Sequence, residues 1–326
     1  MASVQSISLP EQQANPDAFP VGFGPESAMS LDETLKWIRD NRSRLLQQVA
    51  DHGAVLLRGF PLASDQDFDA AIQAFGQQNF TYAESLSNAV RINRTERVFT
   101  ANEAPPEVSI YMHHEMAQTP VFPAQLFFFC EHAPERAGQT PVCRSDWLLD
   151  ALESARPDFV ARCREHGVRY RNTMPDADDA QSGQGRSWRS TLKVDSREAA
   201  EARLAELGYD WEWLADGALS FTSPALPAVR TLNDGRSVFF NQLIAAFRGW
   251  KDAEKSILFG DYSAIDPEDM QVVCDLSDEL TFDIPWQSGD LVLVDNFLVM
   301  HGRRPFGGKR CILVSLVAND GSRLAA

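Results

Sequence analysis

The chain has 326 residues, of which 44% are hydrophobic and 23% charged, a composition that supports one large folded domain with insertions. Its formal net charge of −16 argues against sequence-independent nucleic-acid binding, which needs clustered Lys and Arg to neutralise phosphates. The five cysteines are scattered without a CxxC pair, and no apolar run is long enough to cross a membrane, so we expect a cytoplasmic protein without a disulfide framework or membrane span.

The N-terminal third begins with a polar, proline-rich segment, residues 1–30, which we expect to form a loosely ordered arm before a single domain over 31–326. Ser30 and Glu33 form a capping-box pattern that begins a helix, and Gly53 ends it. A buried strand ("AVLLRGFP") and a second helix ("SDQDFDAAIQAFG") follow.

In the rest of the chain, β-prone segments are followed by a helical pattern and then by further β-prone segments. Short β-prone runs broken by proline cover 99–142, with "AQLFFFCEHA" the clearest strand, and a helical insertion is expected over about 146–216. The late runs "LPAVRTL", "RSVFFNQLI", "DLVLVDNFLVMHG" and "KRCILVSLVAND" read as strands. This order predicts a mainly β protein with flanking helices, an antiparallel sandwich whose two sheets close around a site.

The stretch "SIYMHHEMAQ" places two histidines and a glutamate at what reads as the end of a strand. In an extended chain alternate side chains share a face, so His113 and Glu115 would point together and His114 away from them. One imidazole and one carboxylate at this spacing can bind a single metal ion. The role of His114 stays open between packing, support of the site and substrate contact.

A third metal ligand must come from elsewhere in the chain. His301 directly follows the apolar run "LVLVDNFLVM", in a position similar to that of His113. Two histidines and one carboxylate leave coordination positions open, which is typical of non-haem Fe(II) oxygenases. Zinc hydrolases also use two His and one Glu, so the ligand set alone does not choose the metal.

The segment after His301 supplies an arginine suited to an organic acid. Arg310 begins a new apolar strand nine residues downstream, and a guanidinium can hold a carboxylate through two hydrogen bonds in a partly dry pocket. Iron oxygenases of this kind need a keto acid that chelates the metal and is anchored by its far carboxylate. We expect Arg310 to be that anchor, with the hydroxyl of Thr140 beside it.

These residues resemble the taurine dioxygenase-like (TauD/TfdA) family of Fe(II)- and 2-oxoglutarate-dependent oxygenases, especially its clavaminate-synthase-like and syringomycin-biosynthesis-like branch. The similarity spans roughly 50–317. It rests on these blocks: "GAVLLRGFP", "TANEAPPE", "HHEMAQTPVFPAQLFFFCE", "GQTPV", "SW", "VFFNQLIAAFRGW", "IPWQSGDLVLVDN" and "HGRRPFGGKR".

The resemblance implies a distorted jelly roll, or double-stranded β-helix, in which His113, Glu115 and His301 hold Fe(II). It also implies that Thr140 and Arg310 bind the co-substrate 2-oxoglutarate. The family reaction uses O2 to hydroxylate an unactivated C–H bond, and it releases succinate and CO2. Desaturation or cyclisation would begin in the same way.

Two departures from the family pattern bear on the substrate. The taurine-specific members carry a second arginine four residues after the co-substrate arginine, where this chain has Val314. Halogenating relatives lack the metal carboxylate, but Glu115 is present here, so hydroxylation is favoured. Glu in place of Asp is similar to members that hydroxylate amino acids. We therefore expect an amino acid or a derivative, free or tethered to a carrier protein, as the substrate.

Further polar residues among apolar neighbours are candidates for orienting the substrate. They are Asn102, Glu103, Gln118 and Asn241. A second set of residues could receive an acidic substrate or carrier, namely Arg186, Arg189, Arg303 and Arg304. The run of three phenylalanines at 127–129 is better explained as core. The oligomeric state does not follow from the sequence.

Two other classes of function stay open at this level. A zinc-type hydrolase could use the same three ligands, although the chain has no HExxH motif that would place a general base beside a metal-bound water. A jelly roll without catalytic activity could instead serve as a binding module.

Overall fold

The structure is a computed structural model, and it describes residues 3–10, 12–14, 18–81, 86–87, 91–178, 186–250 and 256–325. Two β-sheets form its centre. The larger has seven strands, in the spatial order β1 (Val4–Ile7), β4 (Val21–Pro25), β5 (Ala54–Leu57), β18 (Leu291–Asp295), β8 (Gln125–His132), β21 (Cys311–Val317) and β6 (Phe99–Thr100).

The smaller sheet carries His113, Thr140 and His301, three of the side chains expected at the site. Its four antiparallel strands are β17 (Thr281–Ile284), β10 (Thr140–Arg144), β19 (Val299–Arg303) and β7 (Ile110–His113), in that spatial order. Strands that neighbour each other in the smaller sheet come from distant parts of the chain, as in a jelly roll. The predicted class, a mainly β jelly roll with helices outside, is confirmed.

Strand β8 separates two hydrophobic layers, because its side chains alternate between the two faces of the larger sheet. Phe128 faces inward, into the core between the sheets. Phe127 and Phe129 face outward, where Phe129 stacks on Phe68 at 5.2 Å between ring centroids. The phenylalanine run is therefore core, as expected, except that Phe128 also lines a cavity described below.

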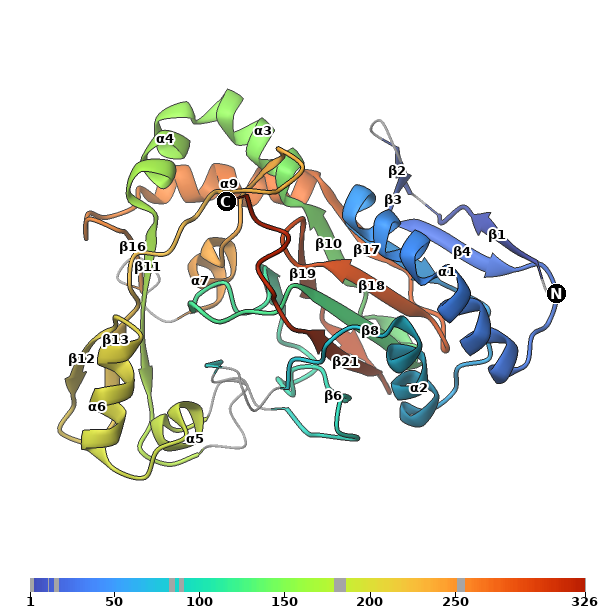
Figure 1. The fold of residues 1–326 in the computed structure, drawn as a ribbon. Coiled ribbons are helices and arrows are strands. Elements are labelled where there is room, and N and C mark those ends of the chain that lie inside the picture. Colours follow the sequence, from blue (N-terminus) through green and yellow to red (C-terminus); the bar gives the residue numbers. More distant parts are fainter. Residues whose placement is uncertain are drawn as a thin grey trace.

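Helices α1 (Leu31–His52) and α2 (Asp65–Phe75) cover the outer face of the larger sheet (Figure 1). Ser30 forms the predicted capping box with Glu33: its side chain accepts from the Glu33 amide, and the Glu33 carboxylate accepts from the Ser30 amide at 2.8 Å. Gly53 ends α1 with a φ of 88°, a conformation that side chains other than glycine rarely adopt. Both helices lie where the sequence predicted them.

The N-terminal segment differs from the loosely ordered arm that its composition indicated. Strand β1 pairs antiparallel with β4, and β4 pairs parallel with β5, so both strands extend the larger sheet. A short pair, β2 (Gln13–Ala14) and β3 (Ala18–Phe19), lies between them in the chain. Phe19 and Phe23 are fully or almost fully buried, and this apolar contact outweighs the polar average of the segment.

The insertion after β10 contains helices and part of a third sheet, which extends past the expected end at 216 as far as Phe259. Its helices are α3 (Ser145–Ala155), α4 (Pro157–His166), α5 (Trp188–Leu192) and α6 (Arg197–Glu206). Its sheet has the strand order β12 (Asp210–Trp213), β13 (Leu219–Thr222), β11 (Val168–Met174) and β16 (Ile257–Phe259). The segment "YDWEWL" was predicted to continue a helix, but it forms β12, because α6 ends before Gly208 and the alternating tryptophans suit a strand.

The remaining elements cover the smaller sheet and its loops. They are α7 (Leu243–Gly249), α9 (Pro267–Glu279) and two-residue strand pairs: β14 (Arg230–Thr231) with β15 (Ser237–Val238), and β9 (Arg136–Ala137) with β20 (Phe306–Gly307). The two late runs expected as full strands thus reduce to the β14–β15 hairpin. Within the described ranges, every helix is too short or too polar to cross a bilayer.

Candidate active site

The smaller sheet brings the two distant histidines face to face. His113 ends β7 and lies directly across from His301 in the middle of β19. Gly302 permits this close approach, because a Cβ atom there would lie 2.4 Å from the carbonyl oxygen of Ile110. The sequence context indicated that His301 directly follows a strand. In the structure it lies within one, β19.

Glu115 reaches the histidines through a turn, not through the strand alternation that the sequence indicated. Strand β7 ends at His113, and the next residues turn, with Met116 at a φ of 60°. Glu115 Oε2 lies 3.4 Å from His301 Nε2 and 3.9 Å from His113 Nε2. One ligand atom from each of the three residues lies within 4.8 Å of the others, a spacing at which all three can coordinate a single ion.

The hydrogen bonds of His113 leave one ring nitrogen free for a metal. Its Nδ1 lies 2.8 Å from the carbonyl oxygen of Tyr111, which can only accept, so Nδ1 carries the proton and Nε2 offers its lone pair toward Glu115. Burial lowers the pKa of His113 to about 4, with a further contribution from His301. The ring is therefore neutral near pH 7, the state that binds metals.

A buried ion pair holds the Glu115 carboxylate. Arg91 Nη2 donates to Glu115 Oε1 at 2.7 Å, and both side chains are at most 8% exposed. Burial alone would raise the pKa of Glu115, but Arg91 and His301 outweigh it and hold that pKa far below its usual range. The carboxylate thus stays charged, with Oε1 on Arg91 and Oε2 facing the histidines.

His114 and Asn296 hold the turn that carries Glu115. Asn296 Oδ1 accepts from the Glu115 amide at 2.8 Å, and its Nδ2 donates to the carbonyl oxygens of Glu115 and Pro123. The fully buried His114 ring contacts the carbonyl oxygens of Asn296 and Phe239. Burial lowers the pKa of His114 to about 3. Of the roles left open for His114, the structure supports packing and support of the site.

A partly buried cation lies beyond the histidines in the same cavity. Arg310, just before β21, donates from Nε to the Gly138 carbonyl oxygen at 2.9 Å and approaches Thr140 Oγ1 at 3.4 Å from Nη2. It forms no ion pair with a carboxylate of any described residue, and burial lowers its pKa to about 10, so it stays protonated at neutral pH. Thr140 Oγ1 also accepts from Trp286 Nε1 at 3.0 Å, which leaves the hydroxyl proton free to donate.

One cavity, of about 470 Å³ with open solvent included, is lined by both the three candidate metal ligands and this cationic end. Phe128, Ile312 and Val314 form apolar walls between them. His301 Nε2 faces Glu115, whereas its Nδ1 is buried without a hydrogen-bond partner among the described residues. The donor set fits a divalent transition metal, and the cationic end fits the carboxylate of an organic acid.

The chain matches the family model described as "Taurine catabolism dioxygenase TauD, TfdA family" over residues 13–316. It belongs to the TauD/TfdA family. As a member of this family it is an Fe(II)- and 2-oxoglutarate-dependent dioxygenase that uses O2. The resemblance noted from its sequence blocks is thereby confirmed.

Two curated relatives of this TauD/TfdA chain align over most of their length. A clavaminate synthase-like protein of Arabidopsis thaliana is 37% identical over 309 residues, which cover 91% of this chain and 93% of the relative. The dapdiamide synthesis protein DdaC of Enterobacter agglomerans is 27% identical over 286 residues, covering 82% and 83%.

Solved structures share the TauD/TfdA fold at low sequence identity. PvcB from Pseudomonas aeruginosa matches with a TM-score of 0.53 at 15% identity, covering 93% of this chain and 87% of that chain. An asparagine oxygenase in complex with Fe(II), 3-hydroxyasparagine and succinate matches with a TM-score of 0.51 at 13% identity, covering 87% and 79%. These similarities support the jelly roll.

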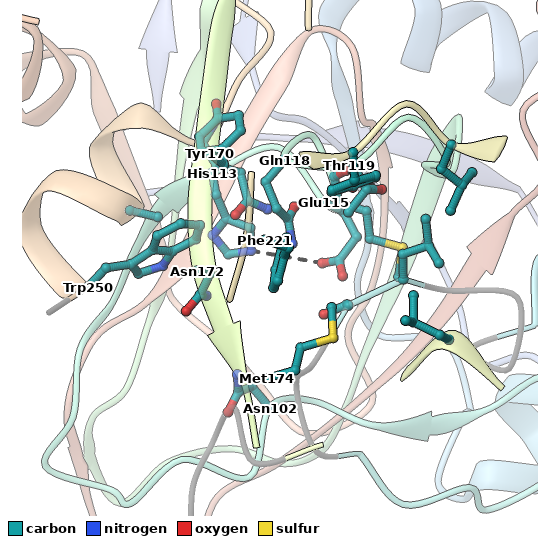
Figure 2. A pocket seen from close by; sticks show the side chains of 18 of the residues that line it. Asn102, His113, Glu115, Gln118, Thr119, Tyr170, Asn172, Met174, Phe221 and Trp250 are labelled. Atoms are coloured by element: carbon teal, nitrogen blue, oxygen red, sulfur yellow. Dashed lines mark hydrogen bonds and ion pairs between the residues drawn. The ribbon is translucent and has the colours of Figure 1, made fainter. Parts of the chain in front are cut away.

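A second, larger cavity of about 950 Å³, including open solvent at its mouth, is also lined by His113 and Glu115. Asn102 and Gln118, two of the four expected substrate contacts, line it (Figure 2). Asn102 also lines the smaller cavity and so lies at their junction.

The other expected substrate contacts lie elsewhere. Asn241 is buried and hydrogen-bonds the backbone of Ala228 and Leu243, so its side chain supports the fold next to His114. Glu103 lines neither cavity in the part of the chain that the structure describes. Its charge lies near Arg303.

The four arginines expected to receive an acidic partner all contact the protein itself. Arg303 donates to four carbonyl oxygens of the 102–108 loop. Arg304 pairs with Asp283, and Arg189 pairs with Asp176. Arg186 donates to the carbonyl oxygens of Ser87 and Ser190. These contacts explain the arginines without an external partner.

Sequence reasoning missed several residues that line or support the site. Arg91 lies in a segment without a recognisable motif, and only the fold brings it to Glu115. Trp286 is part of the block "IPWQSGD", so its presence was visible but its hydrogen bond to Thr140 was not. Tyr170 and Asn172 come from the insertion, whose strand was not predicted.

Proposed function

We propose that this protein hydroxylates an unactivated C–H bond of an amino acid or amino-acid derivative, coupled to oxidative decarboxylation of 2-oxoglutarate to succinate and CO2. In this proposal His113, Glu115 and His301 hold the Fe(II). Thr140 and Arg310 bind the far carboxylate of 2-oxoglutarate. The observation that carries the assignment is Arg310, a partly buried cation without an acidic partner among the described residues, in the cavity that the three ligands also line.

The protein side chains supply binding, orientation and exclusion of water, while the iron supplies the oxidising power. Arg310 and Thr140 would orient the keto acid so that its other end points at the histidines. Phe128 and Val314 would keep water from the co-substrate. The larger cavity would present the substrate on the open side of His113 and Glu115.

Two comparisons support an amino-acid-like substrate. DdaC is named for dapdiamide synthesis, and the asparagine oxygenase was solved with 3-hydroxyasparagine. Both names describe the relatives, and we extend them to this chain only as a proposal. The fully retained His, Glu and His set supports hydroxylation over halogenation for this chain.

Anaerobic addition of Fe(II) and then 2-oxoglutarate tests the assignment directly. We expect a weak visible charge-transfer band and, after admission of oxygen with an accepted substrate, formation of succinate. His301→Ala should abolish both, because it removes one of three ligands, whereas His132→Ala, at the exposed end of β8, should change neither. A His301→Ala band and succinate yield equal to those of the parent would refute the ligand assignment.

A further inference from the structure

The larger cavity changes character with distance from the metal ligands. Near His113 and Glu115 its lining combines the polar Gln118 and Thr119 with the apolar Met116. Farther out the insertion supplies an apolar wall, here called the outer chamber: Met174, Leu192, Leu204, Leu207, Tyr209 and Phe221. Its volume is about 950 Å³ with open solvent included, about twice that of the smaller cavity on the same measure.

Strand β11 connects the two parts of the cavity. Tyr170, Asn172 and Met174 alternate along it, so all three share one face, and all three line the cavity (Figure 2). At about 3.3 Å per residue, Met174 lies about 13 Å along the strand from Tyr170. A ligand that extends from the metal ligands along β11 thus passes from a mixed polar and apolar lining to the apolar outer chamber.

The residues of the outer chamber belong to a small, separate hydrophobic cluster. Met174, Leu192, Leu204 and Tyr209 pack with the buried Trp188, and Leu207 and Phe221 pack against that cluster. The apolar wall is therefore backed by packed side chains. Hydrophobic burial scales with the apolar area removed from water, so such a wall favours an apolar ligand group.

The inner end offers neutral hydrogen-bonding groups. Gln118 Oε1 is buried without a hydrogen-bond partner among the described residues, and Gln118 lines the cavity. A buried amide oxygen without a partner is costly, so a ligand that donates to it is favoured. An N–H of an amide or amine on the substrate meets this requirement.

We infer that the substrate is an amino-acid derivative that carries an apolar acyl or aryl group, with its polar head at Gln118 and its apolar group in the outer chamber. This inference rests on the proposed function and names the substrate class within it. The helical insertion is thus the part of the chain that selects the substrate.

Calorimetry on the protein loaded with Mn(II) and 2-oxoglutarate tests the inference without turnover. The probes are L-alanine, N-octanoyl-L-alanine and octanoate. We expect N-octanoyl-L-alanine to bind at least tenfold more tightly than either of the other two. Equal affinity for L-alanine would overturn the role of the outer chamber, and equal affinity for octanoate would overturn the amino-acid head.

A matched pair of variants tests where the apolar group binds. Leu207→Lys puts a charge into the outer chamber and should lower the affinity for N-octanoyl-L-alanine at least tenfold, whereas Leu214→Lys, on the exposed surface of the same insertion, should leave it unchanged. Phe221→Ala provides a second, milder variant that should also lower this affinity if Leu207→Lys does not fold. Unchanged affinity in the folded chamber variants would overturn the inference.

The same titrations separate this inference from the proposed function. If Mn(II) and 2-oxoglutarate themselves do not bind to the parent protein, the proposed function fails. If both bind but the octanoyl group adds no affinity, only the inference about the substrate class fails.

Discussion

Thr140 illustrates how single atoms define the cationic end of the smaller cavity. Its Oγ1 accepts from Trp286 Nε1 and lies near Arg310 Nη2, so its own proton is directed to an acceptor elsewhere. Together with the Arg310 guanidinium it presents donors only. Such a pair recognises a carboxylate through charge and geometry at once.

Arg310→Ala should mainly raise the requirement for 2-oxoglutarate, by roughly 2 to 5 kcal/mol of lost binding free energy, because the partly buried guanidinium has no acidic partner among the described residues. Titration of the charge-transfer band measures this. Arg304→Ala, which removes an exposed arginine paired with Asp283, is the control and should leave the requirement unchanged. If Arg310→Ala behaves like the control, the anchor lies elsewhere.

The Arg91–Glu115 pair makes a prediction about the metal-free protein. Arg91→Met leaves a buried carboxylate without its cation and should lower the free energy of unfolding by about 3 to 5 kcal/mol. The double variant Arg91→Met with Glu115→Gln should recover much of this loss, because no charge is then left unpaired.

Chemical denaturation of the parent, both single variants and the double variant measures the coupling. Added Mn(II) should stabilise Arg91→Met more than the parent, since the ion then takes over neutralisation of Glu115. Additive losses in the four proteins would show that Arg91 does not act through Glu115.

At the scale of elements, the side chains of β8 alternate between the two faces of the larger sheet. One phenylalanine therefore packs in the outer core, and its neighbour lines the smaller cavity. Phe129 packs under α2 against Phe68, whereas Phe128 lines the smaller cavity and packs edge-on against His301 at 5.2 Å between ring centroids. Neighbours in sequence thus serve different layers of the fold.

Phe129→Ala should cost about 3 to 5 kcal/mol of stability and leave the 2-oxoglutarate requirement of the folded protein unchanged. Phe128→Ala should also lower stability but, in addition, raise that requirement, because it opens the wall beside His301. Denaturation and co-substrate titration of the two variants separate the effects. Equal changes in co-substrate binding would contradict the assignment of the two faces.

At the scale of the whole molecule, the C-terminal segment connects distant parts of the chain. Arg323 donates to Asp295 at 2.9 Å, to Asp234 at 2.6 Å and to the Ala50 carbonyl oxygen at 2.9 Å. Burial raises the pKa of Asp234, but hydrogen bonds from Arg236 and Arg323 outweigh it and hold that pKa below its ordinary value.

Because the pKa of Asp234 is depressed in the folded state, its contribution to stability is present above its unfolded pKa of about 3.9 and is lost as the pH falls through the folded value. Asp234→Asn should therefore be less stable than the parent at pH 7, and the difference should shrink below about pH 4. Thermal unfolding across this pH range measures it. A difference independent of pH would contradict the pairing.

Many of the helices and strands could be predicted from local sequence signals. The helices α1 and α2 follow from their caps and periodicity, and β8, β18 and β21 follow from continuous apolar runs, because these signals come from neighbouring residues. The short β14–β15 hairpin and β12 could not be predicted from these local signals, because the conformation of a short strand depends on the strand it pairs with.

The sequence by itself determined the kinds of chemistry available: two histidines, one glutamate, an arginine and a threonine in a family-typical order. Only the tertiary structure decided that Glu115 arrives through a turn, that Arg91 neutralises it, and that the insertion forms an apolar chamber. The physical reason is that residue identity is local, whereas a cavity and an ion pair are made by side chains that meet only after distant strands have paired.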